Sequence, residues 1–161
     1  MSSSKSPVPS VLFVCTANRI RSPMAEVMFR AKLMAATDDW QKWEVGSAGT
    51  WATPGRQTFP EAQEIMVERS LDISNHRSRM VTEELLKRFN LVLTMEPGQK
   101  EALQLEFPGH SSKIYTLSEM AGVLSPIEDP VGGGLSAFEK TASEIEYWID
   151  AGMERIKKLA Y

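Results

Sequence analysis

A cysteine, an arginine and a serine lie close together near the start of this 161-residue sequence and could do chemistry together. Cys15 and Arg21 enclose five residues, and Ser22 follows at once. The planar guanidinium of Arg21 can grip two oxygens of a phosphoryl group at the same time. A cysteine beside that charge is expected to be a thiolate near neutrality, and the Ser22 hydroxyl could donate a hydrogen bond to its sulfur. A thiolate under a bound phosphoryl group is placed for nucleophilic attack.

The residues around this group predict the elements that would position it. Ser10–Cys15 is short, apolar and rich in β-branched residues, which indicates a buried strand of a parallel sheet. Pro23 suits the first turn of a helix expected over residues 24–33. A loop between such a strand and helix points its backbone N–H groups at one spot, which binds a phosphate-sized dianion. A lone cysteine is more often a small core residue, but its spacing to Arg21 and Ser22 favours a functional interpretation.

The rest of the chain continues the alternation of strands and helices. Further strands are expected at residues 43–47, 91–95 and 113–117, and helices at 60–69, from Thr82 onward, at 99–107 and at 135–159. Thr82 followed by two glutamates is typical of a helix N-cap with an acidic first turn. This order predicts one α/β domain over residues 10–161, preceded by a flexible lead-in at 1–9. Ligands of such domains bind beyond the carboxyl ends of the strands, where Cys15 lies.

Composition excludes several classes of protein. A single cysteine leaves no internal disulfide framework, no Cys-rich zinc site and no CxxC redox pair. A net charge of -3 disfavours a domain-wide nucleic-acid surface, although a local basic pocket stays open. The two histidines, His76 and His110, have no metal-ligand spacing, so we expect no metal. No apolar stretch is long enough for a membrane helix, and the polar first ten residues do not resemble a signal peptide; we therefore expect a cytoplasmic protein with no membrane partner.

In the cysteine loop and in several later segments, the sequence resembles the low-molecular-weight protein-tyrosine-phosphatase family. The match runs from Cys15 to Glu26 and continues in the segments 47–50, 76–79, 91–95 and 129–130. The resemblance implies an α/β domain with a four-stranded parallel sheet and helices on both faces. It also implies hydrolysis of phosphotyrosine or a related phosphoryl group through a phosphocysteine, without metal or cofactor. The substrate would be a phosphorylated protein or a small phosphoester, and the oligomeric state stays open.

The resemblance assigns roles to the matched positions. Cys15 would be the nucleophile, Arg21 the phosphate clamp, and Asp129 the general acid for the leaving group and then the base for water. Asn18 would hold the loop in its tight conformation, since asparagine tolerates left-handed backbone angles. A positioned proton donor accelerates such reactions roughly 10²–10⁴-fold, which supports a need for Asp129. The phosphate-binding set is Thr16, Ala17, Asn18, Arg19, Ile20, Arg21 and Ser22.

Within the loop, three positions depart from the family pattern. Ile20 stands where many members have a second cysteine, so an oxidised Cys15 has no partner thiol in the chain. Arg19 replaces an apolar residue or threonine, and is expected to be either a solvated charge or a second anion contact. Ala17 replaces the usual glycine and could tighten the loop slightly.

The expected pocket rim also departs from the eukaryotic members, which place aromatic residues after the Asp-Pro pair. Here Val131 and three glycines follow instead. Trp51 could form the opposite wall or could simply cover the core. Arg77 and Arg79 are expected to form a solvated basic surface, which could also meet an acidic substrate.

Three alternative functions stay open at this point. The glycine-rich version resembles bacterial members, among them protein-arginine phosphatases, although Arg19 departs from their threonine. An arsenate reductase shares the cysteine loop, but with Cys15 alone it would need an external thiol. A phosphate-loop protein that binds without turnover is the third, and Asp129 argues against it.

Overall fold

The computed structural model describes residues 5–161, so residues 1–4 of the expected lead-in lie outside it. Four strands are present: β1 (Ser10–Cys15), β2 (Glu44–Gly49), β3 (Leu91–Thr94) and β4 (Ile114–Thr116). The α-helices are α1 (Arg21–Ala36), α2 (Pro60–Glu68), α3 (Glu83–Arg88), α4 (Pro97–Glu106) and α5 (Gly134–Ala160). Three short 3-10 helices are η1 (Trp40–Lys42), η2 (Pro108–Lys113) and η3 (Leu117–Ala121).

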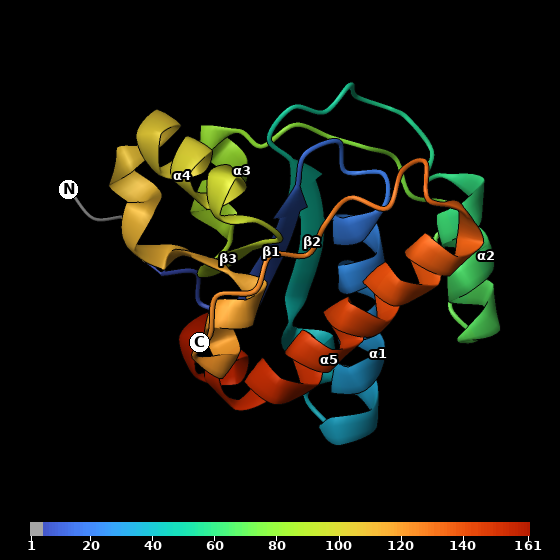
Figure 1. The fold of residues 1–161 in the computed structure, drawn as a ribbon. Coiled ribbons are helices and arrows are strands. Elements are labelled where there is room, and N and C mark those ends of the chain that lie inside the picture. Colours follow the sequence, from blue (N-terminus) through green and yellow to red (C-terminus); the bar gives the residue numbers. More distant parts are fainter. Residues whose placement is uncertain (1–4) are drawn as a thin grey trace.

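The strands form one four-stranded parallel sheet, as the resemblance implied, and the structure gives their order as β2-β1-β3-β4. β1 is therefore central, and its last residue Cys15 is in register with Gly49 of β2. Val14 pairs with Thr94 of β3 on the other side. The carboxyl ends of all strands meet at the same edge, where the loop into α1 emerges (Figure 1).

The sheet is covered on both faces, which confirms the predicted α/β class. Side chains of a strand alternate between faces. In β1, Val11, Phe13 and Cys15 join the larger core cluster, which includes residues of α1, α2 and α5. Leu12 and Val14 join the smaller cluster with residues of α3 and α4. Figure 1 shows α1 and α5 on one side of the sheet and α3 and α4 on the other.

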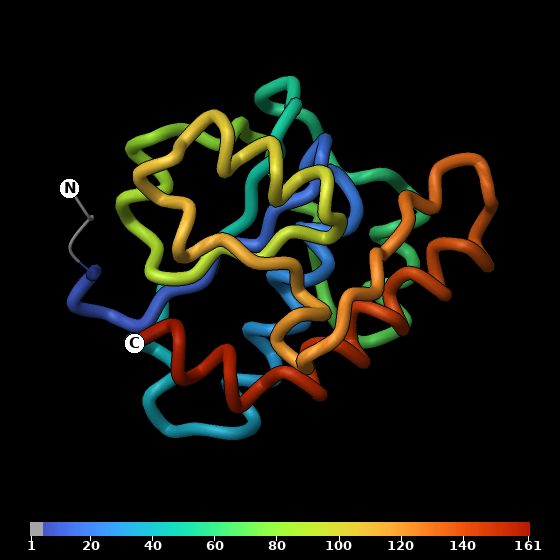
Figure 2. Tube along the Cα trace, turned by 60° about the vertical axis from the view of Figure 1, so that its left-hand side comes forward, coloured from blue at the N-terminus to red at the C-terminus, as the bar shows by residue number. Residues whose placement is uncertain are grey.

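Helix α5 closes the larger core. Its buried side chains recur every three or four residues, which is the spacing of one helical face. They include Phe138, Ala142, Ile145, Ile149 and Ile156. The helix ends beside the N-terminal segment, as the tube in Figure 2 shows, because the Asn90 amide bonds both Val8 O (3.1 Å) and Ala160 O (2.9 Å).

Most element boundaries fall within a few residues of the predictions. Helix α3 begins as expected, because Thr82 Oγ1 accepts a hydrogen bond from Leu85 N at 3.1 Å. Helix α1 begins at Arg21 instead of residue 24, so Arg21 and Ser22 belong to its first turn. No helix within residues 5–161 is long and apolar enough to cross a membrane.

Candidate functional site

The turn from β1 into α1, residues 15–22, is here called the phosphate loop. Among the hydrogen bonds within residues 5–161, none is donated by the backbone N–H groups of residues 17–20. These four successive donors precede the N-terminus of α1, which carries a partial positive charge. Unpartnered amide groups in this position form a concavity for an anion.

The sulfur of Cys15 is the buried floor of this loop. Cys15 is 3% exposed and is a free thiol. Its Sγ lies 2.9 Å from Ser22 Oγ and accepts a hydrogen bond from Ser22 N at 3.4 Å. Asn18 Nδ2 donates to the same Ser22 Oγ, so the hydroxyl proton is left for Cys15 Sγ or for the more distant Ala48 O at 3.4 Å. The backbone N–H and the hydroxyl of Ser22 thus both lie within hydrogen-bonding distance of the Cys15 sulfur.

Asn18 holds the loop in shape. Its φ is 58°, the left-handed region that the sequence analysis expected of it. Its side chain donates to Ser22 Oγ (2.8 Å) and Ser47 Oγ (3.0 Å) and accepts from Arg79 N (3.0 Å). His76 Nε2 lies 2.8 Å from Asn18 O, and because a carbonyl only accepts, this nitrogen carries the proton. Burial lowers the pKa of His76 from its ordinary value of 6.5, so the ring is neutral at physiological pH.

The strand β2 supports the loop from the side. A Cβ on Gly49 would lie 2.3 Å from Thr16 O, so only glycine allows this close approach. The next two residues bond the loop directly: Thr50 N donates to Cys15 O and Trp51 N to Thr16 O, both at 2.9 Å. Trp51 is 80% exposed, so it does not cover the core.

Arg21 is buried and fixed from the opposite side. Its Nη1 donates to Glu96 Oε2 at 2.6 Å and to Ile127 O at 2.7 Å. Glu96 was not among the predicted site residues. The signal that could have found it is its place just beyond β3, at the carboxyl edge of the sheet that carries the ligand site.

The segment 125–133 contains Asp129 and is here called the acid loop. It is tied to the site at Ile127, which donates from its N to Met95 O at 3.0 Å and accepts from Arg21. Asp129, two residues further on, is exposed, and its carboxylate accepts only from Val131 N, at 3.0 Å, within residues 5–161. Val131 is 54% exposed.

The structure shows where the three residues that depart from the family pattern in the phosphate loop lie. Ile20 is buried in the core and Ala17 is exposed. Arg19 is half-buried, with Nε donating to Gln57 O at 2.7 Å and the guanidinium stacked 4.4 Å from the centre of the Phe59 ring. Its side chain therefore binds the segment before α2, a contact that neither of the two sequence interpretations anticipated.

A pocket of about 270 Å³ opens beside the phosphate loop. It is lined by Thr16, Thr50, Glu96, Gly98, Gln99 and Ala102. Gln99 Nε2 donates to Thr16 Oγ1 at 3.0 Å, which joins the start of α4 to the loop.

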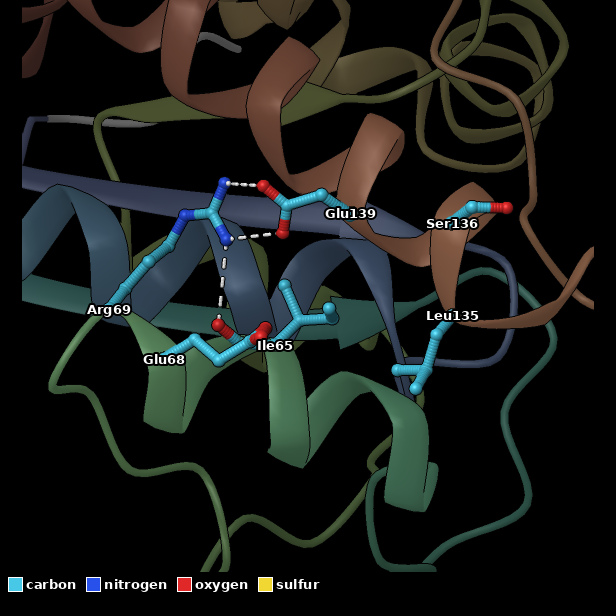
Figure 3. A pocket seen from close by; sticks show the side chains of 6 residues that line it. All are labelled: Ile65, Glu68, Arg69, Leu135, Ser136 and Glu139. Carbon is cyan, nitrogen blue, oxygen red and sulfur yellow. Dashed lines mark hydrogen bonds and ion pairs between the residues drawn. The ribbon is translucent and has the colours of Figure 1, made fainter.

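A larger pocket of about 550 Å³ lies between α2 and α5, away from the phosphate loop. There Arg69 donates to both oxygens of Glu139, at 2.8 and 2.9 Å, as Figure 3 shows. This hydrogen bond with Arg69 lowers the pKa of Glu139, so both groups are charged and neutralise each other. Arg69 is therefore not available in this pocket as an unpaired cation for an anionic ligand. Within residues 5–161, no group of three or more His, Cys, Asp or Glu could hold a metal ion.

The fold and this loop define a class: α/β proteins with a buried cysteine at the end of the first strand, below a loop of unpartnered amide groups. The family model of the low molecular weight phosphotyrosine protein phosphatases matches residues 10–160. The chain belongs to this family, whose members are cysteine-dependent phosphatases.

Relatives fall into two named activities. A protein-arginine-phosphatase of Bacillus subtilis is 34% identical over 149 residues, which are 92% of this chain and 97% of the relative. The tyrosine phosphatase PtpB of Staphylococcus haemolyticus is 32% identical over 139 residues, 86% of this chain and 94% of the relative.

Solved structures agree with this assignment. A low molecular weight protein tyrosine phosphatase from T. tengcongensis has a TM-score of 0.84 at 41% identity, with 91% of this chain and 98% of that chain covered. A YwlE arginine phosphatase with a phosphorylated active-site serine has a TM-score of 0.86 at 31% identity, with 92% and 96% covered.

Proposed function

We propose that the phosphate loop binds the phosphoryl group of a phosphorylated protein and that Cys15 removes it. The observation that carries this proposal is the row of unpartnered N–H groups at residues 17–20 beside the buried sulfur of Cys15. Arg21 adds a second set of donors, because its Nη1 is held by Glu96 while its remaining N–H groups can bind phosphoryl oxygens. A dianion bound there presents its phosphorus to the sulfur.

The reaction proceeds in two displacements. The Cys15 thiolate attacks phosphorus, a P–S bond forms, and the bond to the leaving oxygen breaks while Asp129 gives that oxygen its proton. Water then loses a proton to the Asp129 carboxylate and attacks phosphorus. The P–S bond breaks, which releases inorganic phosphate and restores the thiolate. The related structure with a phosphorylated active-site serine supports a covalent phosphoenzyme.

Phosphotyrosine is the substrate that the rim favours. Thr50 N donates to Cys15 O, and Trp51 is the next residue along the chain. Trp51 is mostly exposed, so an aromatic surface is available beside the site. Aromatic rings stack on such a surface in offset or edge-on geometry. Phosphoarginine is the second candidate, because the acid loop offers only Val131 and glycines as the other wall and because one relative is an arginine phosphatase. The cytoplasmic location predicted from the sequence is part of this proposal.

The test combines two substrates and a matched pair of variants. We expect the protein to hydrolyse a phosphotyrosine peptide faster than the same peptide with phosphoarginine. Rapid acid quenching of Asp129→Asn with substrate should trap a phosphorylated Cys15 peptide, detected by mass spectrometry. Glu128→Gln is the control, since it removes the neighbouring exposed carboxylate.

Two results would overturn the proposal. One is full activity of Cys15→Ser. The other is an equal loss of rate in Asp129→Asn and Glu128→Gln, which would remove Asp129 from its assigned role. Faster hydrolysis of phosphoarginine would replace the preferred substrate by the second candidate and leave the mechanism intact.

A further inference from the structure

The arginines of this chain are unevenly paired. Within residues 5–161, four of the nine form ion pairs with carboxylates: Arg21 with Glu96, Arg30 with Glu26, Arg69 with Glu139, and Arg88 with Glu44. Of the other five, four lie on the phosphate loop or on segments bonded to it, namely Arg19, Arg56, Arg77 and Arg79. The protein as a whole is acidic, with a net charge of -3. The arginines without an ion pair are therefore concentrated at one side of the site.

Three of these arginines, Arg56, Arg77 and Arg79, stand on a small two-segment structure, residues 53–57 and 76–79, here called the basic platform. Gly55 N donates to Ser78 O and Ser78 N donates to Arg56 O, both at 2.8 Å. The backbone of Arg56 is thus paired with the residue that follows Arg77. Arg56 and Arg77 are exposed. Arg77 Nη1 donates a hydrogen bond to the neighbouring carbonyl, His76 O, at 2.8 Å.

Both segments of the platform are bonded to the phosphate loop. His76 Nε2 donates to Asn18 O at 2.8 Å from one segment, and Arg19 Nε donates to Gln57 O at 2.7 Å on the other. Arg79 N donates to Asn18 Oδ1 at 3.0 Å. The platform therefore has a fixed position beside the loop that holds the phosphoryl group.

The opposite side of the site has the other sign of charge. Glu96 bonds Arg21 there, and the acid loop adds the exposed Glu128 and Asp129. A bound phosphoprotein would thus meet cations on one side and carboxylates on the other. Such asymmetry selects the direction in which a charged segment lies.

We propose that the basic platform binds acidic residues next to the phosphorylated residue of a protein substrate. This inference rests on the proposed phosphatase function and names its substrate class: phosphorylated segments that carry Asp or Glu next to the phosphorylated residue. Arg56 and Arg77 make the contacts, because their guanidinium forks match carboxylates. Arg19 and Arg79 are half-buried and hold the platform against the loop.

The test measures binding, so it does not depend on turnover. Two phosphotyrosine peptides are compared that differ only in carrying Asp and Glu, or Asn and Gln, at the flanking positions. Their Kd values for Cys15→Ser protein are measured by fluorescence anisotropy. We expect the acidic peptide to bind about tenfold more tightly at low ionic strength, and the ratio to approach one at high salt, which screens exposed charges.

A matched pair of variants assigns the effect to the platform. In the Cys15→Ser background, the double variant Arg56→Gln/Arg77→Gln should reduce the tenfold ratio to about two or less. Arg155→Gln should leave the ratio at its original value, because Arg155 is also exposed and free of ion pairs within residues 5–161 but lies on α5. A third phosphotyrosine peptide, flanked by lysines, is measured against the same Cys15→Ser protein without further substitutions. We expect it to bind more weakly than the acidic and the neutral peptide.

Equal Kd values for the acidic and neutral peptides, binding of neither peptide, or a ratio unchanged in the double variant would each overturn the inference. Hydrolysis of the neutral peptide by the unmodified protein tests the proposed function separately. If neither that peptide nor its phosphoarginine counterpart is hydrolysed while the ratio of Kd values holds, the proposed function is wrong and the binding role of the platform is kept.

Discussion

The two loops that carry the proposed chemistry are built in opposite ways. In the phosphate loop, Cys15, Asn18, Arg21 and Ser22 are all buried and each side chain has two or more polar partners. In the acid loop, Asp129 is exposed, and a bond from the nearby Val131 N is its only one within residues 5–161. The acid loop is held to the core two residues earlier, at Ile127.

This difference matches the demands on each group. A nucleophile and its anion site must hold a small, constant phosphoryl group, so a rigid network of hydrogen-bonded side chains around the open N–H groups is an advantage. A general acid must reach leaving groups of different size, and a lightly held loop on a fixed anchor can admit them. Changes in the phosphate loop should therefore affect every substrate, whereas changes in the acid loop should depend on the leaving group.

The largest effect is expected for Cys15→Ser. A serine hydroxyl at neutral pH is a far weaker nucleophile than a thiolate, and loss of a nucleophile lowers kcat by about 10⁴-fold or more. Steady-state hydrolysis of p-nitrophenyl phosphate and of an alkyl phosphate measures this, with circular dichroism as the control for folding. A loss confined to one of the two substrates would contradict the role of the phosphate loop.

Asp129→Asn comes next and should depend on the leaving group. We expect kcat to fall by roughly 10²–10⁴-fold for an alkyl phosphate, whose oxygen needs the proton most, and clearly less for p-nitrophenyl phosphate. The free energy of unfolding should barely change, because Asp129 is exposed. The slope of log kcat against leaving-group acidity, measured for both proteins, tests this. An unchanged slope would show that the two loops do not differ in this way.

Two glycine substitutions compare the tolerance of the loops. Gly49→Ala places a Cβ 2.3 Å from Thr16 O, so β2 or the phosphate loop must move; we expect a loss of about 1–3 kcal/mol in the free energy of unfolding and weaker inhibition by inorganic phosphate. Gly132→Ala in the acid loop has open space but a φ of 88°, so about 1 kcal/mol of backbone strain is expected, with phosphate inhibition unchanged. Urea unfolding and phosphate Ki values measure both. Weaker phosphate inhibition in Gly132→Ala alone would reverse the comparison.

The sequence predicted the elements and the core of the phosphate loop because their determinants are local. The apolar run to Cys15, the helix after Pro23 and the cap at Thr82 each depend on a few neighbouring residues. The partners of these residues are not local. Glu96 lies 75 residues from Arg21, and their pairing depends on β3 lying beside β1.

Arg19 shows the same limit. From the sequence, its options were solvent or an anion, because the pattern gives no means of naming a backbone carbonyl 38 residues away. The structure shows Nε on Gln57 O and the guanidinium over Phe59, contacts that only the path of the chain before α2 creates.

The smallest expected effect concerns pH and the support of the phosphate loop. Burial lowers the pKa of His76 below 6.5 in the folded protein, whereas the unfolded chain takes up its proton near 6.5. Below that pH the unfolded state binds more protons than the folded state. The contribution of His76 to the free energy of unfolding is therefore fully present above about pH 6.5 and is lost as the pH decreases. Burial also lowers the pKa of His110, so its contribution to stability depends on pH in the same direction. His110, however, contacts Glu83 of α3 and lies outside the site.

These two histidines therefore separate a general loss of stability from a loss at the phosphate loop. Urea unfolding between about pH 7.5 and 5.5 should show a smaller decline in His76→Gln and in His110→Gln than in the unmodified protein. Inorganic phosphate at a fixed concentration should raise the free energy of unfolding less in His76→Gln than in the unmodified protein, because a phosphate loop without the His76 bond to Asn18 O binds phosphate more weakly. It should raise the free energy of unfolding of His110→Gln as much as that of the unmodified protein. An equal effect of phosphate on both variants would mean that His76 supports the fold as a whole and has no special link to the loop that Asn18 shapes.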